Sequence, residues 1–231
     1  MKKLLLMLFL LTTSLIAAET PPPSLEPYEA KDFSNILGMP GFTDEALKMH
    51  FTLYQGYVKN TNLFIQILDG YAKEGKERTP QYAEIKRRLG WEFDGMRLHE
   101  LYFSNLGGTP DSELDPDSPL CGRIEQDFGT FAAWQENFKS TGLMRGIGWV
   151  VLYLDPVEGR LLNMWIAEHD IGHMAGGKPI LILDVWEHAY LTMYGLDRAA
   201  YIDAFFNNVN WQEVANRFPK DEVPEKKTSR T

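Results

Sequence analysis

The chain has 231 residues, a formal net charge of −9 and 44% hydrophobic residues. Such an acidic chain is a poor partner for nucleic acid or for an anionic membrane surface. Its lone cysteine, Cys121, excludes an internal disulfide, so a hydrophobic core or subunit contacts must stabilise the fold.

The first 18 residues predict a secretory signal peptide. Two lysines precede an apolar run over residues 4–10, and the segment ends in the small residues Ala17 and Ala18. A membrane anchor or a buried helix is the alternative, but an anchor needs about 20 apolar residues, and polar residues at 12–14 interrupt this run. We therefore expect an exported protein, periplasmic or extracellular, with no membrane attachment after cleavage and a mature charge of about −11.

The next segment predicts a leader followed by a helical hairpin. Residues 19–41 begin with several prolines and predict an extended leader. Apolar residues then recur at helical spacing over about 43–68 and again over about 80–106, where two glycines end the pattern. Two long helices with a short connection predict an antiparallel hairpin, which we assign to a domain over residues 42–113.

The second half of the chain changes in pattern and predicts a mixed lobe over residues 114–218. Short apolar runs separated by turn residues indicate strands, and periodic segments before and after them indicate helices. The fold class is therefore α+β, an N-terminal antiparallel helical hairpin followed by a C-terminal α/β lobe with a small three-stranded antiparallel sheet. Residues 219–231 predict a disordered tail. The predicted helices are 121–129, 130–141, 187–194, 198–208 and 211–217, and the predicted strands are 149–154, 161–167 and 179–183.

The strongest local signal for chemistry is the segment Asp184-Val185-Trp186-Glu187-His188. Residues four apart share one face of a helix, so the carboxylate of Asp184 and the imidazole of His188 can converge on one point. The alternative is an aspartate that caps a helix, with a histidine satisfied one turn later. The segment by itself leaves both interpretations open.

This segment, with Ala189 and Tyr190 after it, resembles the signature of the iron/manganese superoxide dismutases. Gly146-Ile147-Gly148-Trp149 and Asn210-Trp211 are similar to two further motifs of that family. The resemblance covers about residues 28–218. It implies disproportionation of superoxide to dioxygen and hydrogen peroxide at one iron or manganese ion per subunit, which alternates between M(III) and M(II). Of the two metals we lean to iron.

The resemblance also implies the residues of the site. Three imidazoles and one carboxylate suit iron or manganese, whereas a structural zinc site would favour thiolates. The ligands carried over from the family are His50, His99, Asp184 and His188. The other matching positions are Tyr57 over the substrate funnel, Phe103, Trp149 and Trp186 as aromatic walls, and Arg198 at the mouth of the pocket.

In the family, a glutamine or a histidine holds the solvent molecule on the metal and so tunes its potential. Gly95, four residues before His99, occupies one position from which the glutamine can come, so it is absent there. His169, 15 residues before Asp184, matches the histidine of the other members and is predicted to be this partner. His173 is the weaker candidate.

The resemblance implies an assembly of two or more subunits. In the family, the glutamate that corresponds to Glu187 reaches across a twofold interface to the metal-binding histidine, here His188 of the partner subunit. We therefore expect a homodimer or a tetramer, with a solvent-exposed glutamate as the alternative.

Two departures from the family pattern concern substrate access. The family's paired histidines before the funnel tyrosine are missing, and seven residues separate His50 from Tyr57 instead of eight. On a regular helix that step places both on one face, about 20° apart. Leu191 stands where many members have a second tyrosine. The sequence does not determine how these changes affect access, nor the metal, the number of subunits or the final compartment.

Two other functions remain as alternatives. A non-haem iron oxygenase uses two histidines and one carboxylate with open coordination positions, but here a fourth ligand is predicted. A relative on the same scaffold that is catalytically inactive, with or without metal, is the second alternative. Loss of ligands would mark a metal-free relative, and all four ligand residues are present.

Overall fold

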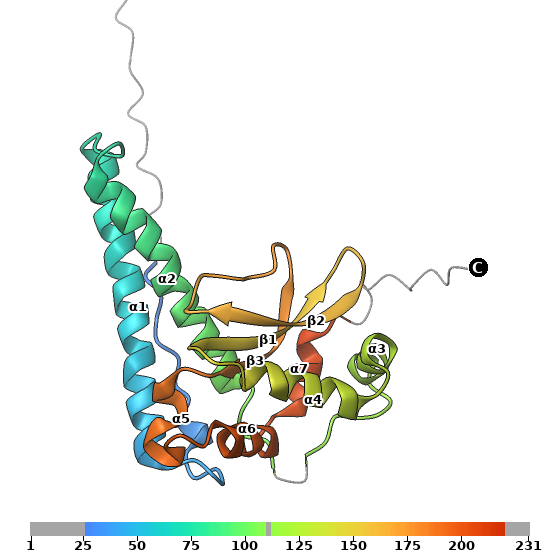
Figure 1. Cartoon of the computed structure of the whole chain (residues 1–231). Coiled ribbons are helices and arrows are strands. Elements are labelled where there is room, and N and C mark those ends of the chain that lie inside the picture. The colour runs from blue at the N-terminus through green and yellow to red at the C-terminus, as the bar shows by residue number, and fades with distance from the viewer. Residues whose placement is uncertain (1–25, 110–111, 220–231) are drawn as a thin grey trace, which may run out of the picture.

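A computed structural model describes residues 26–109 and 112–219. Figure 1 shows a long helical hairpin beside a mixed lobe in which helices lie below and beside a small sheet. This architecture confirms the predicted fold class. The predicted signal peptide over residues 1–18 and residues 220–231 of the predicted tail lie outside the described residues.

The hairpin consists of α1 (Asp44–Lys73) and α2 (Pro80–Ser104). Each helix begins with a threonine whose side chain accepts a hydrogen bond from a backbone N–H of the first turn: Thr43 from Ala46, and Thr79 from Tyr82. Pro80 at the start of α2 has no N–H to leave unsatisfied. α1 continues five residues beyond the predicted end at residue 68, and its last turn ends in a basic residue.

The sheet has the strand order β2-β1-β3, and both pairs are antiparallel. The strands are β1 (Gly148–Asp155), β2 (Arg160–Ala167) and β3 (Lys178–Asp184). Seven of the eight residues of the central strand β1 are buried, which explains its unbroken apolar sequence. Register pairs Trp149 with Asp184, so an aromatic side chain and a carboxylate arrive together at the end of β3.

Five shorter helices complete the second lobe: α3 (Pro119–Phe128), α4 (Phe131–Gly142), α5 (Glu187–Tyr194), α6 (Arg198–Asn207) and α7 (Trp211–Arg217). α4 contacts β1 and β2, whereas α7 contacts β3. An aromatic cluster fills the core between α4, α6 and α7: Trp134, Phe138, Phe206 and Trp211. Figure 1 shows α5 next to the lower half of α1, and these two helices are in contact.

Asn105, just after α2, joins the two lobes. It is fully buried, its Nδ2 donates to the carbonyl of Ile182 in β3 at 2.5 Å, and its Oδ1 accepts from Arg217 Nη1 at 2.6 Å. Its own carbonyl accepts from the backbone N–H of Asn210 at 2.6 Å. Since a buried amide that lost these partners would cost about 1–3 kcal/mol per unsatisfied group, the end of α2 is fixed against the sheet.

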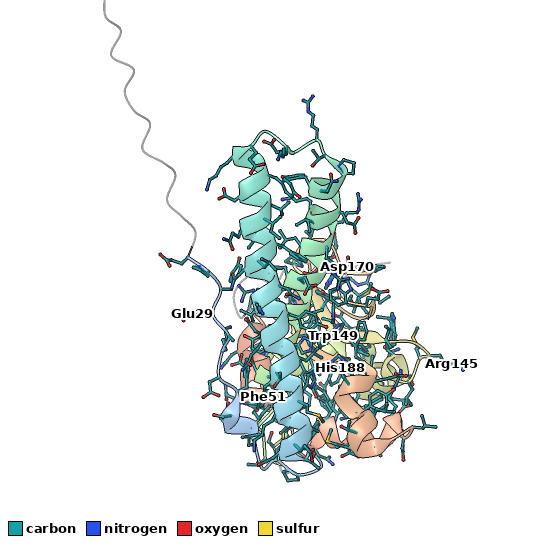
Figure 2. The ribbon with its side chains drawn as sticks, turned by 90° about the vertical axis from the view of Figure 1, so that its left-hand side faces the viewer. Glu29, Phe51, Arg145, Trp149, Asp170 and His188 are labelled. Carbon is teal, nitrogen blue, oxygen red and sulfur yellow. The ribbon has the colours of Figure 1, made fainter. Side chains whose placement is uncertain are left out.

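The described part of the predicted leader, residues 26–41, lies against the hairpin. Its only regular element is the short 3₁₀ turn Ser34–Ile36. Tyr28 exchanges two hydrogen bonds with the side chain of Asn62 in α1, and the Lys31 ammonium lies 3.0 Å from Glu100 in α2. Figure 2 shows this segment, which carries Glu29, running beside α1. Within residues 26–109 and 112–219, no helix has both the length and the apolar character needed to cross a lipid bilayer.

Candidate metal centre

Four side chains from four different elements meet between the two lobes. His50 comes from α1, His99 from α2, Asp184 from the end of β3, and His188 from the first turn of α5. Each offers one ligand atom, and these atoms all lie within 4.8 Å of one another. Oδ2 of Asp184 lies 3.2 Å from Nε2 of His50, 3.2 Å from Nε2 of His188 and 3.8 Å from Nε2 of His99. One carboxylate oxygen and three imidazole nitrogens therefore face one point.

In His99 and Asp184, the polar atom that does not face the centre forms a hydrogen bond with the surrounding backbone. Nδ1 of His99 lies 2.6 Å from the carbonyl of Gly95, to which it must donate because a carbonyl only accepts. Its Nε2 therefore faces the centre with a free lone pair. Oδ1 of Asp184 accepts from the backbone N–H of Trp186, which leaves Oδ2 for the centre. The Tyr201 hydroxyl donates to the Asp184 carbonyl at 2.7 Å and fixes the backbone as well.

The protonation states also suit a cation. Burial lowers the pKa of His50, and burial and then His50 hold the pKa of His99 well below its usual value. Both rings are therefore neutral, the form that binds metal. Burial alone would raise the pKa of Asp184, but the imidazoles of His188 and His50 hold it well below its usual range, so the carboxylate is ionised.

Two buried nitrogens at this site lack a hydrogen-bond partner among the described residues, which is what the ligand nitrogens of a metal site would show. They are Nε2 of His50 and Nε2 of His99. A buried nitrogen without a partner costs about 1–3 kcal/mol, and a cation at the common point would bind both. The donor set of three imidazoles and one carboxylate suits iron or manganese. The lone thiol, Cys121, is buried in α3 and is not one of the four ligand residues.

A neutral histidine and a phenol lie directly behind these four residues. Trp149 Nε1 donates to Nδ1 of His169 at 3.1 Å, so the His169 proton is on Nε2, which lies 2.9 Å from the Tyr57 hydroxyl. Burial lowers the pKa of His169 to about 4 and raises that of Tyr57 above its usual value. His169 therefore donates to Tyr57, and the Tyr57 O–H remains free to donate to a further acceptor.

His169, rather than His173, lies beside the centre. The His169 ring is 6.0 Å from the ring of His99, centroid to centroid, and is fully buried. The His173 ring is partly exposed and bonds to Tyr153 and to the His169 carbonyl. Gly95 cannot carry a side chain in this arrangement, because an added Cβ would lie 2.8 Å from Cδ1 of Tyr57.

Known proteins are similar to this chain over most of its length. Residues 116–217 match the family described as iron/manganese superoxide dismutases, C-terminal domain. A superoxide dismutase [Fe] of Cupriavidus metallidurans is 38% identical over 184 residues, which cover 77% of this chain and 89% of that protein. One from Aquifex pyrophilus is 34% identical, covering 83% and 91%. Superoxide dismutase [Mn] 2 of Haloferax volcanii is 34% identical, covering 78% and 88%.

The chain belongs to the iron/manganese superoxide dismutase family. Within this superoxide dismutase fold, the predicted aromatic residues surround the ligands. Phe103 lies 4.9 Å from the His50 ring, and Trp149 lies 4.9 Å from the His99 ring, between centroids. Trp186 stacks on His169 at 4.9 Å and lies 5.9 Å from His188. His50, His99 and Asp184 are buried, and the low local dielectric strengthens electrostatic interactions among them.

Two predicted residues lie further from the ligands. Glu187 is exposed and lines a surface cavity of about 650 Å³ together with Arg198. The Arg198 guanidinium donates to the Tyr190 hydroxyl and to the carbonyls of Met144 and Gly146, at 2.8 to 3.2 Å. Arg198 therefore holds the chain just before β1, and its role as a cation that attracts substrate stays a prediction.

Trp91 and Glu168 are the residues of this region that sequence reasoning did not find. The Trp91 ring lies 4.4 Å from His169 and 5.5 Å from Tyr57, between centroids, and its Nε1 donates to Glu168 at 3.1 Å. The only available signal was weak: Trp91 precedes His99 by eight residues on the same helix, about 80° around it. The contact with Glu168 spans 77 residues and has no local signature.

Proposed function

We propose that this protein is a superoxide dismutase that converts two superoxide ions and two protons to dioxygen and hydrogen peroxide. The observation that carries the proposal is the meeting of three imidazole nitrogens and one carboxylate oxygen, all within 4.8 Å, next to a hydrogen-bonded His169–Tyr57 pair. Bound iron or manganese supplies the one-electron chemistry by alternating between M(III) and M(II).

The protein supplies the metal ligands and a residue that can donate a proton. His50 and His99 present neutral nitrogens, His188 presents a third nitrogen, and Asp184 presents one negative charge, so the site compensates part of the charge of the cation. The raised pKa of Tyr57 keeps its phenol protonated over the whole physiological range. Since the Tyr57 oxygen accepts the hydrogen bond from His169, its O–H is free to donate a proton in the reaction.

Superoxide consumption by metal-loaded protein tests this function. Protein freed of metal and reloaded separately with iron or with manganese should consume superoxide with at least one of them. We propose iron as the working metal, supported by the similarity to relatives that are named for iron. Activity with manganese alone would contradict the choice of metal, and activity with neither would contradict the function. Dioxygen uptake that needs an organic cosubstrate would instead favour an oxygenase.

We further propose export and self-association. Export is supported by the apolar segment at residues 4–10 between two lysines and two small residues. Self-association is supported by the exposed Glu187, by His188, whose side chain is 26% exposed, and by Leu191, which is 43% exposed. Mass spectrometry of the secreted protein should give an N-terminus after residue 18, and light scattering should give a dimer or a tetramer. An uncleaved N-terminus or a monomer would contradict the respective proposal.

A further inference from the structure

His173 lies in the loop between β2 and β3 and forms two short hydrogen bonds. Its Nε2 lies 2.7 Å from the backbone carbonyl of His169, and its Nδ1 lies 2.7 Å from the Tyr153 hydroxyl. A carbonyl only accepts, so Nε2 carries the proton, and Nδ1 of a neutral ring must accept from Tyr153. Burial, and then the carboxylate of Asp94, raise the pKa of Tyr153 to about 12, so its hydroxyl keeps the proton that it donates.

Tyr153 anchors the His173 ring to a rigid part of the fold. It lies in β1, the central strand, and is 4% exposed. Asp94 of α2 lies 3.7 Å from Nε2 of His173. His173 therefore links the sheet, through Tyr153, to the carbonyl of His169 in the loop, and the Asp94 carboxylate of the hairpin lies close to the same ring.

The backbone at this carbonyl needs such a support. Glu168, directly before His169, has a φ of 55°, and within residues 26–109 and 112–219 it is the one non-glycine residue with a positive φ. An L-residue with a long side chain adopts this conformation only when its surroundings impose it. Trp91 holds the Glu168 carboxylate on one side, and His173 holds the His169 carbonyl on the other. Figure 2 places Asp170 of this loop next to α2.

We propose that His173 is a positioning residue for the dismutase reaction. By holding the carbonyl of His169, it orients the His169 ring so that Nδ1 accepts from Trp149 and Nε2 donates to Tyr57. His173 touches neither the ligands nor Tyr57 and acts only through His169. This role rests on the proposed function where turnover is concerned, but the orientation of His169 is a property of the protein that can be measured separately.

A set of variants of the metal-loaded protein tests the role. His173→Ala should retain its metal and lose about tenfold in turnover, because a misplacement of about 1 Å at a reacting group is enough for such a loss. His173→Gln should restore turnover to within about twofold, since its amide can both donate to the carbonyl and accept from Tyr153. The matched control is Ile171→Ala in the same loop, where the side chain is 59% exposed and turnover should not change.

The decisive experiment is a double-mutant cycle with His169→Ala. If His173 acts through His169, adding His173→Ala to His169→Ala should cause no further loss of turnover. The midpoint potential of the metal should also shift in His173→Ala in the direction that His169→Ala produces, and the double variant should match the His169 variant. Additive losses, or an unchanged potential in His173→Ala with full metal content, would overturn the proposal.

Failure of the two proposals can be told apart. A metal-loaded wild-type protein without superoxide consumption would refute the proposed function, whereas the potentials of the same variants would still test the orientation of His169. If His173→Ala does not fold, Tyr153→Phe decides: it keeps the ring and removes only the proton donated to His173. That variant should lose turnover and shift the potential in the same direction, and wild-type values in both measurements would count against the proposal.

Discussion

The hairpin and the mixed lobe each supply two ligands, but they position them in different ways. His50, in the second turn of α1, and His99, near the end of α2, project from long regular helices, where each turn is fixed by the next. Asp184 and His188 come from the end of a strand and the start of a short helix, and the neighbouring His169 comes from an irregular loop. Helical ligands follow from periodicity, whereas strand-end and loop residues depend on contacts across the fold.

The two regions also differ in how strongly a single substitution should disturb the site. A helix residue can be altered with little effect unless the new side chain would meet a close neighbour, as at Gly95, where an added Cβ would meet Tyr57 of the other hairpin helix. The loop at Glu168–His173 depends on a few individual hydrogen bonds, to Trp91, to Tyr153 and to the His169 carbonyl. The following experiments compare these two kinds of support.

The largest effect is expected for Asp184→Asn. Asparagine keeps the acceptor for the Trp186 N–H but removes the negative charge that faces three imidazoles. Metal content should fall to a small fraction of the wild-type value, and activity should fall at least about a hundredfold. Asp203→Asn is the control, because its carboxylate is 63% exposed and only pairs with Lys139. Full metal content in Asp184→Asn, measured by plasma mass spectrometry, would contradict a ligand role.

The next effect is a pH dependence that comes from His169. Its pKa is lowered to about 4 by burial, against about 6.5 in an unfolded chain, so the unfolded state binds more protons between these values. Stability should therefore fall as pH decreases below about 6.5 and level off below about 4. For metal-depleted protein, the free energy of unfolding in urea should drop by about 2 kcal/mol more between pH 7 and pH 5 in wild type than in His169→Gln. Equal drops would contradict a buried neutral His169.

Gly95→Ala tests the hairpin side. A Cβ at Gly95 would lie 2.8 Å from Cδ1 of Tyr57, so this ring must shift from the position in which it meets His169. Activity should fall about tenfold with metal retained, since such a displacement weakens the hydrogen bond between His169 and Tyr57. Gly90→Ala on the same helix is a matched control, because its Cβ would meet no atom within 4 Å. The control should gain up to about 1 kcal/mol in stability and keep its activity, and equal activities in both variants would contradict the steric argument.

The smallest effect is expected for Tyr57→Phe, which removes the hydrogen bond between the two regions. His169 Nε2–H loses its acceptor, which should cost about 1–3 kcal/mol in stability. Activity should fall about threefold to tenfold, because the metal ligands are unchanged and only the proton donor is lost. Tyr71→Phe, near the tip of the hairpin, serves as control. Unchanged stability and activity in Tyr57→Phe would show that the pair does not contribute.

Much of this organisation follows from local pattern. Helical periodicity predicted both arms of the hairpin, and the apolar runs predicted all three strands. The seven-residue step predicted that His50 and Tyr57 share one face of α1, and both are buried on its inner side. The segment from Asp184 to His188 left a metal site and a helix cap as alternatives, and the resemblance to the iron/manganese superoxide dismutases favoured the metal site.

Other features required the tertiary structure. The resemblance had already favoured His169 over His173, but the direction in which the loop turns the His169 ring, toward Trp149 and Tyr57, is set by contacts over 20 and 112 residues. Two other features also depend on contacts between distant residues: the close packing of the Tyr57 ring against Gly95, and the hydrogen bond from Trp91 to Glu168.

Local sequence pattern therefore determined the class of fold, because regular elements are local properties, and the resemblance to the iron/manganese superoxide dismutases supplied the four ligand residues and the metals that suit them. Only the tertiary structure decided how His169 is oriented and what holds it. The physical reason is that an irregular loop has no repeating hydrogen-bond pattern of its own, so its conformation is set by the side chains that reach it from the rest of the fold.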